Sequence, residues 1–196
     1  MPRKARVLCD NAVYHVFNRG HNKYDLFKSE RDFIVFKDII RKCKGNFMFE
    51  LYNYVFMSNH FHFLIKIINA KNLPKIMKEI CQRYASYYKK TYGHVGYLFQ
   101  NRYKSIHIEV DSYLLECARY IERNPLRARV VKNLCYYKWS SYGFYADGAE
   151  DDIVTVNPLY LDFGNNAKER QEKYREYVLT PRPYEAIVDE FVASMK

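Results

Sequence analysis

The chain has 196 residues, 32 Lys and Arg against 22 Asp and Glu, and a formal net charge of +10. Its 20 Tyr and 13 Phe exclude a disordered chain, because disordered segments are poor in aromatic residues. No uncharged run reaches the roughly 18 residues that a membrane span needs, and the N-terminal residues lack an apolar signal-peptide segment. We therefore expect a cytoplasmic protein without a membrane partner, in which the five scattered Cys are reduced thiols.

The charge is divided unevenly along the chain. Residues 1–145 hold 26 basic and 11 acidic residues, whereas residues 146–196 hold 6 basic and 11 acidic ones. We expect one domain over 1–145, followed by an acidic linker and a helical tail over 146–196. A basic, aromatic body is typical of a nucleic-acid-binding protein, because Lys and Arg neutralise phosphates and aromatic rings stack on bases. A basic protein with a Tyr-rich core is the alternative.

Hydrophobic periodicity predicts alternating strands and helices in the body. Strands are expected over residues 12–18, 47–56, 60–68 and 103–110. Helices are expected after a Ser29–Asp32 capping box, after an Asn72 cap, and from Asp111 to about Asn124, where Pro125 should end the helix. The order predicts an α+β fold, a ferredoxin-like βαββαβ antiparallel sheet with helices over one face. In the tail, helices are expected near 167–178 and after Pro183.

The third predicted strand contains two histidines that share one face. A period of two places His60 and His62 together, while Phe61, Phe63 and other apolar residues form the core face. Two imidazoles about 7 Å apart along a strand can bind one divalent cation. Histidines with purely structural hydrogen bonds are the alternative.

The helix after Asp111 places further polar groups at helical spacing. Tyr120 and Asn124 are separated by one turn, so a phenol and an amide oxygen lie on one face. Arg119 and Arg123 form a second such pair, suited to binding phosphate. In a chain with 20 Tyr, packing is the alternative role for any one of them.

Several ordered motifs together resemble HUH-type single-tyrosine transposases, in the branch of REP-associated tyrosine transposases. The resemblance runs from about Val13 to Tyr142 and rests on these segments: YHVFNRG (14–20), FMSNHFHFLIK (56–66), GYLFQNRYKS (96–105), SYLLECARYIERNPLRARVV (112–131) and WSSY (139–142). The family's usual Pro between Met and Asn is Ser58 here.

The resemblance implies a role for each matching residue. His60 and His62 would hold Mg²⁺ or Mn²⁺, with Asn124 as a third ligand. Tyr120 would be the nucleophile that cuts DNA through a 5′-phosphotyrosine intermediate and rejoins strands. Tyr113 and Tyr103 are the rival nucleophiles.

The implied substrate is single-stranded DNA beside a REP-like hairpin. The residues expected to contact DNA are Arg19, Asn59, Arg102, Lys104, Arg123 and Arg127. Those expected to stack on bases are Tyr97, Phe99 and Tyr103. His107 is a possible further ligand, and a homodimer is possible because a full transposition cycle uses two tyrosines or two successive steps.

Two other functions remain open from the sequence. One is a DNA- or RNA-binding regulator that keeps the fold without cutting, although the intact His60, His62 and Tyr120 argue against it. The other is a purely structural or partner-binding domain, which would lack salt-dependent affinity for single strands.

Overall fold

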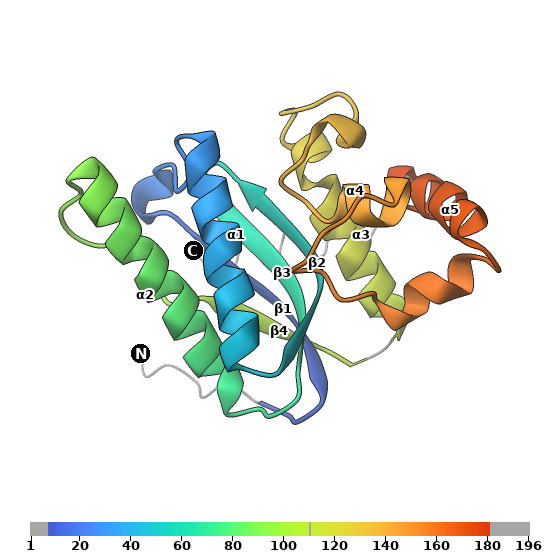
Figure 1. The fold of residues 1–196 in the computed structure, drawn as a ribbon, viewed down its shortest axis with the longest axis horizontal. Coiled ribbons are helices and arrows are strands. Elements are labelled where there is room, and N and C mark those ends of the chain that lie inside the picture. Colours follow the sequence, from blue (N-terminus) through green and yellow to red (C-terminus); the bar gives the residue numbers. More distant parts are fainter. Residues whose placement is uncertain (1–7, 110, 181–196) are drawn as a thin grey trace.

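A computed structural model describes residues 8–109 and 111–180. Its centre is a four-stranded antiparallel sheet with the strand order β2-β3-β1-β4 (Figure 1). The strands are β1 (Ala12–Arg19), β2 (Phe49–Met57), β3 (His60–Ile67) and β4 (Lys104–Ile108). The helices are α1 (Glu30–Asn46), α2 (Asn72–Tyr92), α3 (Asp111–Arg127), α4 (Tyr142–Asp147) and α5 (Ala167–Leu179). The predicted α+β class and βαββαβ order are confirmed.

The ends of the first two helices test the capping predictions. The Ser29–Asp32 capping box before α1 is confirmed, and the Ser29 backbone N–H donates to the Asp32 carboxylate at 2.8 Å. Asn72 is not a cap but the first residue of α2, so that prediction is wrong. The N-cap position is Lys71, whose side chain makes no capping hydrogen bond, and Asn69 Oδ1 accepts from the backbone N–H of Lys71 at 3.1 Å in the turn before the helix.

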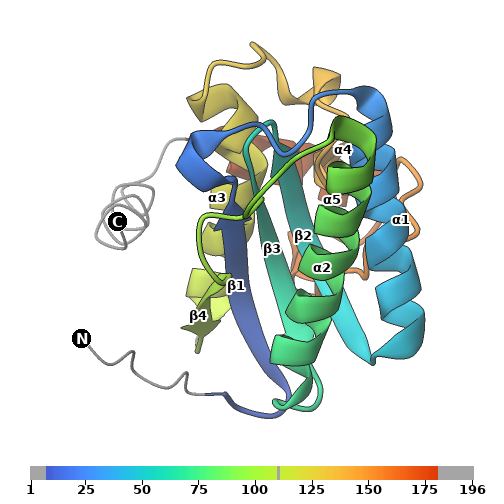
Figure 2. The same cartoon turned by 90° about the vertical axis from the view of Figure 1, so that its left-hand side faces the viewer.

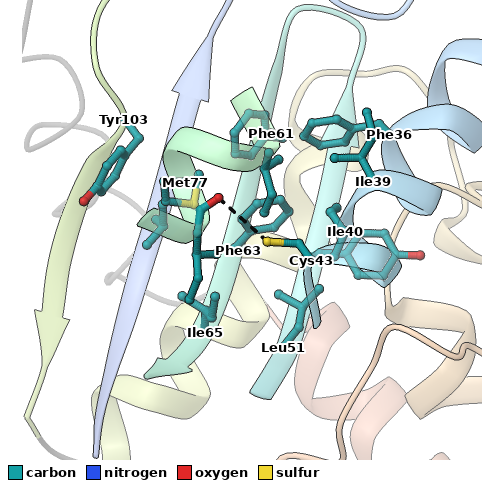
Figure 3. Packing of buried hydrophobic residues seen from close by; sticks show 14 of the residues in the cluster. Phe36, Ile39, Ile40, Cys43, Leu51, Phe61, Phe63, Ile65, Met77 and Tyr103 are labelled. Carbon is teal, nitrogen blue, oxygen red and sulfur yellow. Dashed lines mark hydrogen bonds between the residues drawn. The ribbon is translucent and has the colours of Figure 1, made fainter. Parts of the chain in front are cut away.

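One face of the sheet forms the main core under α1 and α2 (Figure 2). The apolar residues of β3 point to this face, as their spacing predicted, and Phe61 and Phe63 pack against Phe36 of α1 (Figure 3). Ile65 of β3 and Met77 of α2 are buried in the same cluster. Because the odd-numbered residues of β3 face this core, its even-numbered residues face the other way.

The opposite face is covered by α3, which corrects the expectation that the helices lie over one face (Figure 1). Leu64 of β3 and Val55 of β2 are fully buried there against Cys117 and Ile121 of α3. The reason is that β2 and β3 carry apolar side chains on both faces, so both faces need a covering layer. This second layer brings α3 beside the histidines of β3.

Pro125 does not end α3, which continues to Arg127. The proline ring lacks the N–H that would reach the carbonyl of Ile121. The side chain of Asn124 supplies donors in its place, since Nδ2 donates to the carbonyls of Tyr120 at 2.9 Å and Ile121 at 3.4 Å. The expected end at Asn124 was therefore wrong by one turn of helix.

The acidic segment expected as a linker is packed against the body. The Asp151 carboxylate forms an ion pair with Lys37 of α1 at 3.0 Å and accepts from the Tyr54 hydroxyl at 2.7 Å, and Ile153 is fully buried. The expected boundary at residue 145 falls inside α4. The helix expected near 167–178 is α5, and the one expected after Pro183 lies outside the described residues. The division into 1–145 and 146–196 stays a prediction.

Candidate active site

His60 and His62 lie on the face of β3 that is turned toward α3. Their ring centres are 5.2 Å apart and the rings are perpendicular. His60 begins the strand directly after the Ser58–Asn59 turn, so it lies at the edge of the covered face, whereas His62 is only 3 % exposed beneath α3. The predicted placement of the pair on one face is confirmed by this arrangement.

Helix α3 places Tyr120 and Asn124 against these histidines. The rings of Tyr120 and His62 are 5.7 Å apart and meet edge to face. Asn124 lies one turn further along, within hydrogen-bonding reach of the His60 ring. Because Asn124 Nδ2 donates to the carbonyl of Tyr120, its Oδ1 is the atom left to face His60.

A cavity of about 300 Å³ opens over these four side chains. It collects eight of the ten residues predicted for the site: Arg19, Asn59, His60, His62, Arg102, Lys104, Tyr120 and Asn124. The remaining lining residues of the described chain are Phe17, Asn18, Lys23, Gln100 and Asn101, so four cationic side chains and no acidic one surround the cavity.

Two predicted arginines lie outside this cavity. Arg123 donates from Nη1 to the carbonyls of Val178 at 3.0 Å and Leu179 at 2.7 Å, at the C-terminal end of α5. Arg119, its expected partner in binding phosphate, is fully buried and donates to the carbonyl of Thr180. Cations are favoured at a helix C-terminus, where carbonyls lack partners, so both arginines of this pair bind the end of α5. Phosphate binding by the pair stays a prediction.

Arg127 also lies outside the lining, but it contacts the proposed nucleophile. Its guanidinium carbon is 4.9 Å from the centre of the Tyr120 ring. A cation over an aromatic face is attracted by the ring quadrupole. The positive charge of Arg127 therefore lies over the ring of Tyr120, and both residues belong to α3.

The rival nucleophiles and several other candidates are not in the cavity. Tyr113 is half exposed on α3, and Tyr103 is buried in the core cluster of α1 and α2, where it cannot stack on a base. His107 pairs with Glu109 at 3.4 Å, away from the other histidines. Tyr97 is 86 % exposed and remains available for stacking.

Sequence reasoning missed one buried histidine of the site. His15 of β1 is 1 % exposed, and its Nε2 lies 2.9 Å from Nδ1 of His62. Strand alternation in AVYHVFNR places His15, Phe17 and Arg19 on one face, which was a usable signal. The contact itself depends on how β1 is aligned with β3, and one strand alone does not reveal this.

The electrostatic surroundings keep the imidazoles neutral and the cavity positive. Burial lowers the pKa of His15 to about 3 and that of His60 to about 4. Burial, with the neighbouring His15, His60 and Arg127, holds the pKa of His62 well below its usual value. Burial and the charge of Arg19 lower the pKa of Lys104. Neutral imidazole is the form that binds metals, and crowded cations favour an anionic ligand.

The donor set fits a cation with mixed nitrogen and oxygen ligands. Within residues 8–109 and 111–180, no group of three or more His, Cys, Asp or Glu is placed to hold a metal. A cation at the histidine pair therefore needs an oxygen of another kind. Asn59 Oδ1 lies 2.7 Å from His60 Nδ1, and an amide oxygen only accepts. If the proton of neutral His60 is on Nδ1, its other ring nitrogen and Asn124 Oδ1 are both acceptors. A cation between two such acceptors satisfies both.

Two further observations concern the cysteines and the helices. All five cysteines are free thiols, and two of them are buried. Across the described part of the chain, no helix has the length and apolar character to cross a membrane.

The chain is similar at 16 % identity to the solved structure of a REP-associated tyrosine transposase bound to a REP hairpin, with a TM-score of 0.64 over 80 % of this chain and 93 % of that one. A crystal structure of a putative transposase from Deinococcus radiodurans matches at 16 % identity and a TM-score of 0.43, over 66 % of this chain and 92 % of that one. No curated protein matches the sequence. The sequence also matches the family described as "Transposase IS200 like" over residues 9–124. This match covers more than half of the chain, and it shows that the protein belongs to the IS200-like transposase family.

Proposed function

We propose that this transposase cuts and rejoins single-stranded DNA through Tyr120, beside a divalent cation held by His60, His62 and Asn124. One observation carries the proposal: the Tyr120 ring lies 5.7 Å from the His62 ring, inside a cavity lined by cations. A phenol, two neutral imidazoles and an amide oxygen are what a metal-assisted tyrosine nuclease needs in one place.

The cation is Mg²⁺ or Mn²⁺ in this proposal. When bound, it supplies positive charge that polarises the scissile phosphate and fixes its orientation. The chain contributes ligands whose other polar atoms are already bonded: Asn59 binds Nδ1 of His60, and the carbonyl of Tyr120 binds the amide of Asn124. Such partners hold ligands in position before the cation arrives.

Tyr120 carries out the chemical step. Its hydroxyl oxygen attacks the phosphorus, the bond from phosphorus to the 3′ oxygen breaks, and the phenolic proton is transferred in net to that oxygen. The products are a 5′-phosphotyrosine and a free 3′-hydroxyl, which can later attack the same bond and reseal a strand without ATP. Arg127 over the Tyr120 ring favours the phenolate, because it places a positive charge near the developing negative one.

The substrate is a single strand next to a hairpin. Arg19, Lys23, Arg102 and Lys104 surround the cavity, so a phosphate backbone entering it is neutralised along its path. A cavity of about 300 Å³ accommodates an extended strand better than a duplex. The similar REP-associated transposase is bound to a REP hairpin, which supports the same class of ligand and the same branch of the family.

The proposal needs only one chain for a single cut. Tyr120, His60, His62 and Asn124 of the same chain line one cavity, so no partner residue is required for that step. A homodimer for the full cycle stays a prediction, as does a cytoplasmic location.

A covalent-adduct assay tests the function. Labelled single strands bearing hairpins are incubated with Mg²⁺ or Mn²⁺ and separated on SDS gels, with EDTA as the metal control. The wild type should form an SDS-resistant adduct, Tyr120→Phe should form none, and Tyr113→Phe, which changes a half-exposed tyrosine of the same helix, should behave as wild type.

An adduct formed by Tyr120→Phe would show that another residue is the nucleophile. Metal-independent binding of hairpins without any adduct from the wild type would instead support the non-cleaving regulator.

A further inference from the structure

The buried contact between His15 and His62 has no part in the chemistry described so far. The two residues lie on adjacent antiparallel strands, where Phe17 is aligned with His62 and His15 with Leu64. Both imidazoles point toward α3 and are almost fully buried, and His15 Nε2 is 2.9 Å from His62 Nδ1. Two neutral rings at this distance share one proton, so one nitrogen donates and the other accepts.

The protonated nitrogen of His60, the other proposed ligand, follows from its contact with Asn59. The Asn59 amide nitrogen donates to the carbonyl of Lys23 at 3.3 Å, which sets the orientation of the amide. Its oxygen therefore faces His60 Nδ1, and an oxygen of this kind only accepts. The proton of neutral His60 must then be on Nδ1, which leaves Nε2 with a free lone pair.

For His62, the position of its single proton depends on which ring donates in the contact with His15. If the shared proton is on His62 Nδ1, His62 Nε2 is free to bind a cation. If it is on His15 Nε2, the single proton of neutral His62 moves to Nε2, and that nitrogen cannot be a ligand. Only the first arrangement gives both histidines of β3 the same free nitrogen.

We propose that His15 is a positioning residue, which accepts the Nδ1 proton of His62 and so holds His62 in the tautomer whose Nε2 binds the cation. This rests on the proposed function, since it presumes a cation at His60 and His62. Ligand histidines in metal sites generally donate the N–H of their other ring nitrogen to a carboxylate, a backbone carbonyl or water, and here Nε2 of His15 takes that place. The proposal assigns that partner to β1, a strand that contributes no ligand.

Within residues 8–109 and 111–180, His15 is the hydrogen-bonding partner of the His62 ring, and the other close neighbours are aromatic rings. Phe17 stacks on it with ring centres 5.4 Å apart, and Tyr120 meets it edge to face. Without His15, a proton on His62 Nδ1 would be buried against carbon, which costs free energy. The proton would then be on Nε2, and the cation would lose a ligand.

Metal affinity tests the assignment without any DNA cutting. Free Mn²⁺ is measured by electron paramagnetic resonance while each variant is titrated. His15→Leu should weaken Mn²⁺ binding by about 10- to 100-fold, the range found for outer partners of metal ligands. His15→Gln, whose side-chain oxygen can accept in place of Nε2, should restore affinity toward the wild type. His107→Gln changes a histidine outside the cavity and should leave affinity unchanged.

Nitrogen NMR reads the tautomers in the unmodified protein. With Mg²⁺ bound, the two-bond proton–nitrogen correlations should place the proton of both His62 and His15 on Nδ1, with Nε2 of each ring unprotonated. A proton on His15 Nε2 in that state would overturn the assignment, even if every His15 variant failed to fold.

The outcomes separate the two proposals. If the wild type binds no Mn²⁺, the proposed metal site fails. If the wild type binds Mn²⁺ and a folded His15→Leu binds it equally well, the metal site stands and the role of His15 is refuted.

Discussion

Glu122 should make the protein less stable as the pH rises, and Glu122→Gln should remove that effect. The side chain is fully buried and accepts from Asn53 Nδ2 at 2.8 Å and from the Ser141 hydroxyl at 2.6 Å. These two partners and the third one, Tyr174, are neutral, so no cation among the described residues offsets a buried carboxylate. Burial raises the pKa of Glu122 to about 8 from a usual value of 4.5, although its hydrogen bonds lower it.

The sign and size of the effect follow from this difference. The folded state keeps the proton of Glu122 between about pH 4.5 and 8, whereas the unfolded state loses it. Stability contributed by the neutral acid is thus complete below pH 4.5 and lost as the pH rises through 8. At about 1.4 kcal/mol per pKa unit, the full loss is about 5 kcal/mol.

Urea unfolding at a series of pH values measures this directly. Glu122→Gln keeps an oxygen for Asn53 and Ser141 but has no charge to bury. At pH 5 the two proteins should have similar free energies of unfolding, and at pH 9 the variant should be more stable by several kcal/mol. All other groups titrate in both proteins, so their contributions cancel in the difference. Identical pH dependence of wild type and variant would refute the reasoning.

Two further predictions concern DNA affinity and the core. For a single strand, log K falls with log salt, and Arg102→Gln should make this slope less negative by about 0.7, because one phosphate contact is lost. Arg123→Gln should leave that slope unchanged, since Arg123 binds the end of α5, and fluorescence anisotropy distinguishes the two. Equal slopes for both variants would contradict the mapped cavity. Phe36→Ala should destabilise the fold by about 3–5 kcal/mol, because Phe36 is fully buried among aromatic rings. Ile34→Ala, at an exposed position of the same helix, should change stability by less than about 0.5 kcal/mol in the same urea assay.

Local periodicity was enough to predict the strand that carries the histidines. Alternation in β3 separates His60 and His62 from Phe61 and Phe63, and this depends only on the pleat of one strand. The same holds for the spacing of Tyr120 and Asn124 on α3. That both pairs meet in one cavity required α3 to cover the second face of the sheet, which follows from apolar residues on both faces of β2 and β3.

The contacts that sequence reasoning missed are those made between distant segments. The role of His15 depends on the alignment of β1 with β3, and nothing in a single strand states which residue lies opposite. Arg119 and Arg123 are indeed near each other on α3, but each also donates to carbonyls at the end of α5, more than 50 residues away in sequence. Pro125 was expected to end a helix because the replacement donor, the side chain of Asn124, acts only in the folded turn.

The central claim, that Tyr120 is the nucleophile, is tested most directly by locating the covalent bond. Trypsin cleaves after Arg119 and Arg123, so Tyr120 lies in a four-residue peptide that contains no other tyrosine. After reaction with a hairpin-bearing single strand and Mg²⁺, followed by nuclease digestion, mass spectrometry should find a nucleotide joined through its 5′-phosphate to the peptide of residues 120–123. The same mass on a peptide that carries Tyr113 or Tyr103 would contradict the account.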